Sequence, residues 1–161
     1  MIQRIQSFLL VLALVGFVLL FMFPTATYEA GTTKSSLTLV PGENSLNQET
    51  GEAFIAQNSV LLMVMAIALG IGTLVSIFLY KNRLRQMKFV SILGLINLVY
   101  IGIAFLASIP DAENALKPMG EVSTTYSVGT FVPIVTLIFI VIAQRAIRSD
   151  EMKVRAADRI R

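Results

Sequence analysis

Four apolar stretches alternate with polar segments along this chain. A helix needs roughly 20 mainly apolar residues to cross a hydrocarbon core of about 30 Å, and each stretch approaches or reaches that length. None contains an acidic residue, and their one cation is Arg145, near the end of the last stretch. The stretches cover residues 7–23, 59–80, 89–109 and 127–147. This pattern predicts an all-α membrane protein, a four-transmembrane-helix bundle in which residues 1–161 form a single domain.

The first stretch also has features of a cleaved signal peptide. Arg4 supplies a basic start, and an apolar core follows it. That core is longer than the usual 7–15 residues, and the segment after Pro24 offers only a poor cleavage site. We therefore interpret the stretch as a retained span.

Between the first two stretches lies a long polar segment, residues 24–58. Leu37 and Leu39 alternate there with polar neighbours, and Pro41-Gly42 is a turn signal. A short β-hairpin is consistent with this pattern. The segment also holds Glu49 and Glu52, the one pair of carboxylates that we consider for acid–base chemistry.

Polar and small residues inside the stretches predict helix packing. Asn97 stands near the centre of the third stretch, where its amide can bond across helices. Ala68, Gly72 and Ser76 are spaced by four residues in the second stretch, so they line one side of a helix and allow close approach, either within the bundle or to another protein. Pro133 stands near the start of the fourth stretch, where it either occupies the first helical turn or kinks the helix.

Charge is distributed unevenly along the chain. Of thirteen Lys and Arg residues, all but Lys34 and Lys117 lie before the first stretch, in the link 81–88, or from Arg145 onward. Acidic residues dominate the segments 24–58 and 110–126. By the positive-inside rule, both termini and the link 81–88 are cytoplasmic.

Composition narrows the chemistry. The chain is 55% hydrophobic with a mean hydropathy of +0.75, and it has no Cys and no His. These absences exclude disulfides, thiolate ligands and the commonest general base. No ionisable residue stands in the middle of a stretch, as a proton relay requires. We expect neither an enzyme nor a cofactor, and no metal site.

The C-terminal tail, residues 150–160, is predicted to form an amphipathic cytoplasmic helix. Ser149 is a suitable N-cap, and Asp150 and Glu151 favour the first turn of a new helix. Met152, Ala156 and Ile160 would then line one apolar stripe. We expect this helix to bend away from the fourth span near Ser149 and to lie at the membrane surface, although an unbroken extension of the span is also compatible with the sequence.

The basic link and tail supply the candidate contacts with a partner or with lipid headgroups. Anionic headgroups attract surface Lys and Arg by about 1 kcal/mol each, whereas nucleic-acid binding needs a broader patch and is not expected. The candidate residues are Lys81, Asn82, Arg83, Arg85, Lys88, Arg145, Arg148, Asp150, Glu151, Arg155, Asp158, Arg159 and Arg161.

Several motifs give the chain a family likeness. They are Met1-Ile-Gln-Arg-Ile-Gln6, Lys81-Asn-Arg83, Tyr126-x-x-Gly129-x-x-x-Pro133-Ile134 and Arg145-x-Ile-Arg148-x-Asp-Glu151-x-x-Val-Arg155-x-x-Asp-Arg-Ile-Arg161. With them the chain resembles a family of small four-span membrane proteins from Bacteroidota that is known as a domain of unknown function. It departs from that family at Leu84-Arg85, where Lys-Leu is usual, and at Gln144, where Asn is usual. The resemblance implies a bacterial inner-membrane location and supplies no activity.

Two functional hypotheses follow. The first is a non-catalytic membrane subunit, or an assembly or accessory factor, that binds a membrane-protein partner or a second copy of itself. The alternative is a small homodimeric transporter or lipid-handling protein, in which Asn97, Tyr100 and Thr136 line a path.

Overall fold

The computed structural model describes residues 2–30, 33–39, 59–117 and 121–158. Helices dominate this part of the chain, and three short strands accompany them. In chain order the elements are α1 (Ile2–Leu19), β1 (Ala26–Ala30), β2 (Thr33–Leu37), α2 (Ser59–Phe78), the 3-10 turn η1 (Leu79–Lys81), α3 (Arg83–Ile103), the π-helical turn η2 (Ala104–Ser108), α4 (Ile109–Leu116), β3 (Val122–Tyr126) and α5 (Val128–Asp158).

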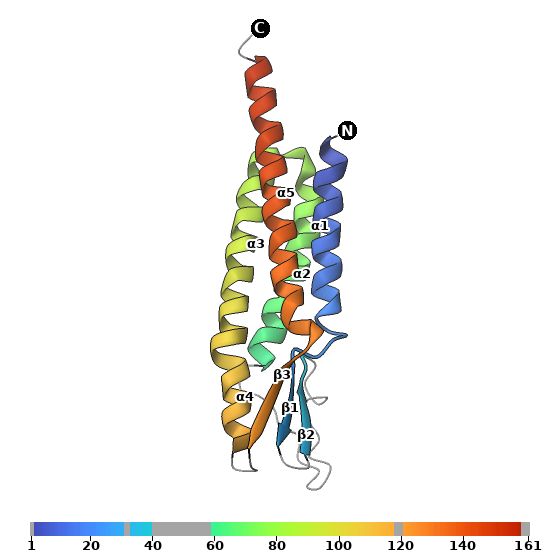
Figure 1. The fold of residues 1–161 in the computed structure, drawn as a ribbon. Coiled ribbons are helices and arrows are strands. Elements are labelled where there is room, and N and C mark those ends of the chain that lie inside the picture. The colour runs from blue at the N-terminus through green and yellow to red at the C-terminus, as the bar shows by residue number, and fades with distance from the viewer. Residues whose placement is uncertain (1, 31–32, 40–58, 118–120, 159–161) are drawn as a thin grey trace.

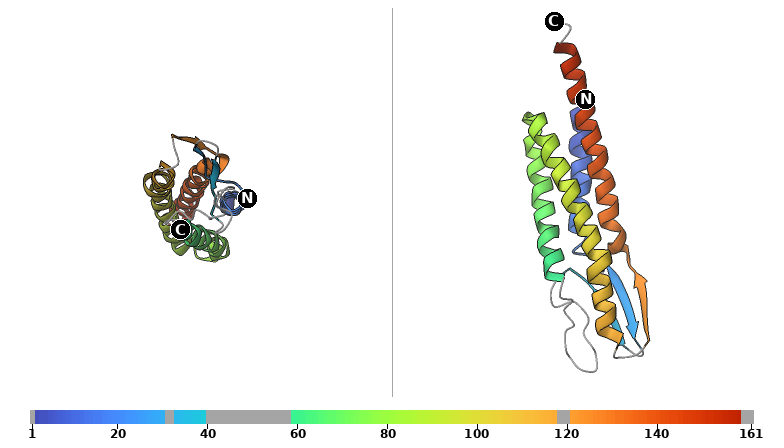
Figure 2. Two further views of the ribbon diagram at one scale, coloured as in Figure 1. Left: turned by 90° about the horizontal axis from the view of Figure 1, so that it is seen from below. Right: turned by 90° about the vertical axis from the view of Figure 1, so that its left-hand side faces the viewer.

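The four long helices α1, α2, α3 and α5 lie side by side in an elongated bundle (Figure 1). The start of α1, the η1 turn and the end of α5 share one end of the bundle, and the strands and α4 occupy the other end (Figures 1 and 2). The link 81–88 and the two ends of the described chain therefore lie on the same side, as the charge pattern requires.

Three segments are long and apolar enough to cross a membrane: Val60–Phe78, Arg83–Asn114 and Val128–Val154. Ile5–Leu19 is a shorter apolar helix. Large apolar side chains cover the outside of the bundle; Phe8, Leu95 and Leu106 are 61%, 63% and 82% exposed. A water-soluble domain rarely exposes so continuous an apolar surface. The prediction of a mainly helical protein is confirmed, and three of its helices are long and apolar enough to span a membrane.

The tail differs from our prediction. α5 runs without interruption from Val128 to Asp158, so no separate helix begins after Ser149, and the expected bend is wrong. The reason is that a residue favourable at an N-cap does not itself break a helix, and the stretch from Ile134 to Asp158 contains neither Gly nor Pro. The alternative of an unbroken extension is correct.

All four long helices contribute to the bundle core, and the most extensive contact between two of them joins α1 to α5. Leu10, Ala13 and Phe17 of α1 are buried, as are Ile140 and Ala143 of α5. The two helices approach closely at one point, where a side chain on Gly16 would overlap the methyl group of Thr136. A small residue at this position therefore sets the spacing of α1 and α5.

The strands form an antiparallel sheet in the order β2-β1-β3. Ala26 pairs with Leu37 on one side and with Tyr126 on the other. A hairpin is thus present in the first long segment, but it consists of β1 and β2 and ends at Leu37, before the expected turn at Pro41-Gly42, which lies outside the described residues. Strand β3 was not predicted.

The sheet is fastened to the helix that continues α3. Tyr28 of β1 is buried, and its hydroxyl donates a hydrogen bond to the carbonyl oxygen of Ile109 at 3.2 Å. Phe105 of η2 stacks on Tyr126 of β3, with ring centroids 6.3 Å apart. These contacts fix the sheet against the end of the bundle.

Candidate functional site at the basic end of the bundle

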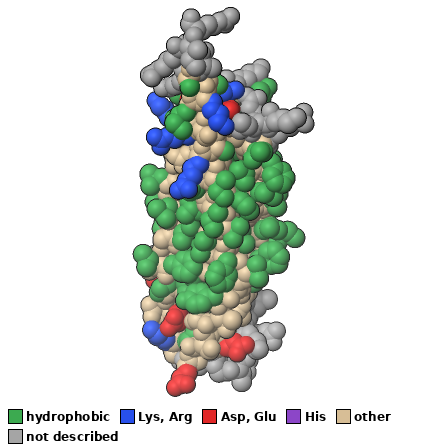
Figure 3. Space-filling view, turned by 45° about the horizontal axis from the view of Figure 1, so that its top comes forward, with side chains coloured by type: hydrophobic (Ala, Val, Ile, Leu, Met, Phe, Trp, Pro, Cys, Tyr) green, Lys and Arg blue, Asp and Glu red, His purple; other side chains and the backbone are tan. Residues whose placement is uncertain are grey.

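Lysine and arginine side chains gather at the end that holds η1 and the last turns of α5, beyond the apolar band (Figure 3). We call this region the basic end. Acidic side chains on the β1 and α4 side mark the opposite end. The described cations of the basic end are Arg83, Arg85 and Lys88 of α3 and Arg145, Arg148 and Lys153 of α5.

One ion pair joins α3 to α5 at this end. Nη1 of Arg83, the first residue of α3, lies 3.2 Å from Oδ2 of Asp150. The two side chains are 30% and 14% exposed, so water screens the pair only in part. Nη1 is buried and makes no hydrogen bond, so the attraction to Asp150 leaves a donor unused.

Beside this ion pair lies an open groove of about 370 Å³. Asn82, Arg83, Leu84 and Arg85 form one wall, and Glu151 of α5 forms the other. We call it the α3–α5 groove. The structure therefore brings residues of the Lys81-Asn-Arg83 motif together with Asp150 and Glu151 of the tail motif, although these motifs lie far apart in the sequence.

The remaining candidates fall into two groups. Lys88, Arg145 and Arg148 are exposed and do not line the groove. For the other candidates the structure describes no side chain, so they stay predictions. They are Lys81, Arg155 and Asp158, whose backbone alone is described, and Arg159 and Arg161, which lie outside the described residues.

Three glutamine side chains that the sequence analysis missed fasten helices together near the basic end. Gln6 and Gln86 are buried, and Gln144 is half-buried. Their hydrogen bonds are Gln6 Nε2 to the Ala146 carbonyl at 3.2 Å, Gln86 Nε2 to the Ser76 carbonyl at 3.0 Å, and Gln144 Nε2 to Ser91 Oγ at 2.8 Å. In the sequence, these contacts could have been predicted from the position of each glutamine near the edge of an apolar stretch.

Of the residues predicted to pack helices, Asn97 lies at the centre of the bundle and is completely buried. Gly72 faces α3, where an added Cβ would lie 2.6 Å from Leu93 Cδ2. Ser76 is buried as well. Ala68 is exposed, because the inward side of α2 passes through the neighbouring Ala66 and Leu69. Of the two predicted contacts for Ala68, packing against another protein stays a prediction.

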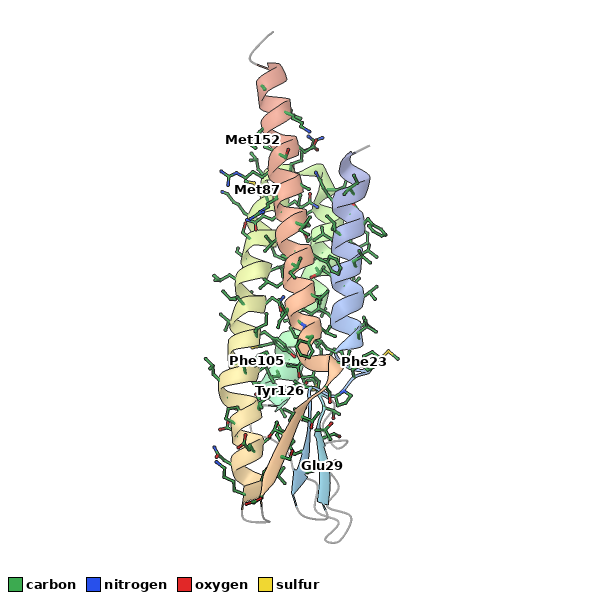
Figure 4. All side chains as sticks on the ribbon, in the orientation of Figure 1. Phe23, Glu29, Met87, Phe105, Tyr126 and Met152 are labelled. Atoms are coloured by element: carbon green, nitrogen blue, oxygen red, sulfur yellow. The ribbon has the colours of Figure 1, made fainter. Side chains whose placement is uncertain are left out.

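The motif Tyr126-x-x-Gly129-x-x-x-Pro133 forms the joint between the sheet and α5. The Gly129 N–H donates to the Pro24 carbonyl at 3.1 Å. A Cβ on Gly129 would lie 2.5 Å from that oxygen and 2.7 Å from the carbonyl oxygen of Phe23, so only glycine fits. Figure 4 shows Phe23 near the joint and Tyr126 against Phe105. This motif therefore serves the fold.

Comparison with known proteins places these motifs in a family. Its profile, described as "Domain of unknown function (DUF4293)", matches residues 2–160. The chain belongs to the DUF4293 family. No curated protein and no solved structure matches it. The resemblance to a family of unknown function is confirmed, and the family description carries no activity to transfer.

Within residues 2–30, 33–39, 59–117 and 121–158, no three Asp or Glu side chains gather closely enough to hold a metal ion. Glu49 and Glu52 lie outside these residues. Burial raises the pKa of the Tyr28 phenol, with Glu113 and Tyr126 adding to the effect, and this keeps Tyr28 a neutral hydrogen-bond donor.

Proposed function

We propose that this protein is a four-span component of a bacterial inner membrane and acts as a non-catalytic subunit, or as an assembly or accessory factor, of a larger membrane complex. Three helices suited to crossing a membrane support the four spans, and so does α1. Its 18 residues extend about 27 Å, and apolar residues continue to Phe23. The Bacteroidota origin implied by the motifs belongs to the same proposal.

The positive-inside rule orients this proposal. The basic end faces the cytoplasm, so both termini are cytoplasmic, and the sheet lies on the outer side. Support comes from the grouping of the link 81–88 with the ends of α1 and α5, away from Glu29, Asp111 and Glu121. Hydrophobic length and charge thus favour the same arrangement.

The observation that carries the functional proposal is the projection of α5 beyond the other helices (Figures 1 and 4). Ile147 is buried in the bundle and Asp150 still pairs with Arg83. After this point Met152 and Val154 are 57% and 42% exposed. From Asp150 to Asp158 the helix rises about 12 Å.

A straight projecting helix changes what its apolar side chains can contact. A bent tail would rest Met152 on the bilayer surface, whereas the observed α5 continues in the direction of its span and moves away from the headgroups. Exposed apolar side chains on such a helix favour a protein partner, because burying each of them is worth about 1.5–3 kcal/mol. We therefore assign the segment 152–158 to partner binding and call it the projecting segment.

The buried polar residues support a scaffold more than a transport path. Asn97 and Gln86 donate to backbone carbonyls of neighbouring helices, so their amides are used in joining helices. A small homodimeric transporter or lipid-handling protein remains the competing hypothesis, and the experiment below separates it from a subunit.

The test is affinity purification of the full chain from its own membranes in several mild detergents, with chemical crosslinking and mass spectrometry. We expect one larger membrane complex to copurify. The double variant Met152→Gln/Ala156→Gln changes two exposed residues on one side of the helix and keeps the helix formers, the charge and the ion pair. It should lose the partner by tenfold or more, as the burial of the Met152 side chain implies. Glu121→Gln, at the opposite end, is the control and should keep it.

Isolation of the full chain without a crosslinked partner in every detergent would contradict the proposal. Recovery of crosslinked homodimers alone, together with a transport defect in a deletion strain, would favour the transporter. Retention of the complex by the double variant would remove the projecting segment from the interface.

A further inference from the structure

The α3–α5 groove has the composition of an anion site. We propose that it binds the phosphate group of an anionic membrane lipid. Arg83 and Arg85 stand on one wall with the amide of Asn82, and the groove of about 370 Å³ is large enough for a headgroup phosphate with its bound water. Arginine suits this ligand because its planar guanidinium donates two parallel hydrogen bonds to phosphate oxygens.

Arg83 supplies an observation that is independent of charge. Its Nη1 is buried, lies 3.2 Å from Asp150 and still makes no hydrogen bond. A buried donor without an acceptor is unfavourable, and a charged donor is more so. Arg83 lines the groove and its side chain is 30% exposed, so a rotation of the guanidinium would bring this donor to a phosphate oxygen there.

The first turn of α3 adds donors at the same place. The first α-helical bond of α3 runs from the Gln86 N–H to the Asn82 carbonyl at 2.9 Å, so the preceding N–H groups have no partner inside the helix. The Asn82 side chain does not cap them, and the first turn contains no acidic residue. The positive end of this 21-residue helix therefore reinforces the arginines.

The carboxylates nearby leave the region positive. Residues 82–88 and 148–151 hold four cations, Arg83, Arg85, Lys88 and Arg148, against Asp150 and Glu151. Asp150 is paired with Arg83, and Glu151 has an interaction of its own within the chain. Arg83 and Arg85 are thus matched by the two carboxylates at the groove itself, and the surplus positive charge of the region comes from Lys88 and Arg148 outside its lining.

The position of the groove favours a lipid over a free phosphate. Leu84, 46% exposed, lines the groove itself, and the exposed Ile92 and Leu95 follow on α3. Ile92 lies about 12 Å along the helix from Leu84, which is well within the length of an acyl chain. A lipid can thus place its phosphate among the arginines and its chains on the apolar side of α3. This step rests on the membrane orientation proposed above.

The test uses the full chain purified in detergent and titrated with dioctanoyl phosphatidylglycerol by native mass spectrometry. Dioctanoyl phosphatidylcholine is the zwitterionic comparison, and inorganic phosphate is the competitor. We expect phosphatidylglycerol to bind in preference to phosphatidylcholine. Arg85→Gln should weaken this binding about tenfold or more, which corresponds to the loss of one charged hydrogen-bonding partner. Arg85→Lys should restore part of it, and Lys117→Gln, with the same loss of charge at the opposite end, should have no effect.

Three results would overturn the proposal. Equal weakening by Arg148→Gln would indicate a diffuse basic surface and no specific groove. Equal binding of phosphatidylcholine would remove the role of net charge, and displacement by inorganic phosphate at the lipid's own concentration would replace the lipid with a free phosphate. Because the purified chain is used alone, these outcomes are independent of partner copurification, and Met152→Gln/Ala156→Gln should bind the lipid normally.

Discussion

Asn97 of α3 donates a hydrogen bond from Nδ2 to the carbonyl oxygen of Pro133 in α5, over 3.1 Å. The same carbonyl accepts a second bond from Thr136 Oγ1 at 2.8 Å. Pro133 lies inside α5 and has no N–H of its own to give to the helix. The polar contact between α3 and α5 thus lies at the proline of α5, whose missing N–H interrupts the backbone hydrogen bonds of that helix.

This shared acceptor makes the energetic effect of Asn97 small and non-additive. We expect Asn97→Leu to lower the free energy of unfolding by about 1 kcal/mol, because Thr136 continues to satisfy the Pro133 carbonyl. Thr136→Val should have a similar effect, and the double variant should lose more than the sum, since the carbonyl then has neither side-chain donor. Thermal unfolding in detergent measures all three. A stable, abundant Asn97→Leu protein with no remaining transport activity would instead support a path through the bundle.

Gly129 offers the sharpest test of the joint between the sheet and α5. Gly129→Ala places a methyl group against two backbone carbonyl oxygens, at 2.5 and 2.7 Å, and neither atom can rotate away. We expect the free energy of unfolding to fall by about 1–3 kcal/mol. Gly102→Ala is the control, because a Cβ there meets nothing within 4 Å and alanine favours a helix by up to about 1 kcal/mol. Equal stability of the two variants in thermal unfolding would contradict the observed joint.

The features that were predicted correctly are those that sequence pattern determines locally. Apolar length identified the helices, and the alternation around Leu37 and Leu39 indicated a hairpin. Asn97 stood out because an amide is costly in an apolar bundle without a partner. Such signals depend on the neighbours of a residue in the chain.

The features that were missed depend on contacts between distant segments. β3 pairs with β1, almost a hundred residues earlier, and its Ser- and Thr-rich sequence has no apolar alternation to reveal it. Ala68 has the right size and spacing for packing, but the rotation of α2 turns it outward. At Ser149 the cap signal was real, yet nothing stopped α5 from continuing through it. The α3–α5 groove likewise exists only because Arg83 and Asp150 meet in space.

The Arg83–Asp150 ion pair should contribute measurably to holding the projecting helix. In a double-mutant cycle with Arg83→Gln and Asp150→Asn, we expect a coupling free energy of about 0.5–1 kcal/mol, at the upper end of surface pairs because both side chains are partly buried. The coupling should decrease as salt is raised from low concentration to about 1 M, where the screening length is roughly 3 Å. Thermal unfolding of the four proteins at both salt concentrations provides the measurement. A coupling near zero at low salt would show that the two side chains do not interact in solution.

Tyr28 should make the sheet end sensitive to alkaline pH. Burial raises the pKa of its phenol above the ordinary value of about 10, so the neutral form is favoured in the folded state. Its contribution to stability is therefore complete below about pH 10 and is lost as the pH rises further. Tyr28→Phe should cost about 1 kcal/mol at about pH 8, through loss of the bond to the Ile109 carbonyl, and should show a shallower decline toward about pH 11. Parallel pH profiles of the two proteins in thermal unfolding would contradict this role.

The orientation of the bundle can be tested by cysteine labelling, because the chain has no cysteine of its own. Glu121 is exposed beside the sheet, and Lys153 is exposed on the projecting segment, so the variants Glu121→Cys and Lys153→Cys place single thiols at opposite ends of the molecule. With the basic end in the cytoplasm, an impermeant thiol reagent added to intact cells with a permeable outer envelope should label only Glu121→Cys. Both variants should react after the inner membrane is opened, which controls for thiol reactivity. The reverse pattern would invert the topology and place the α3–α5 groove and the projecting segment outside the cell, where neither a cytoplasmic partner nor the inner lipid leaflet is available to them.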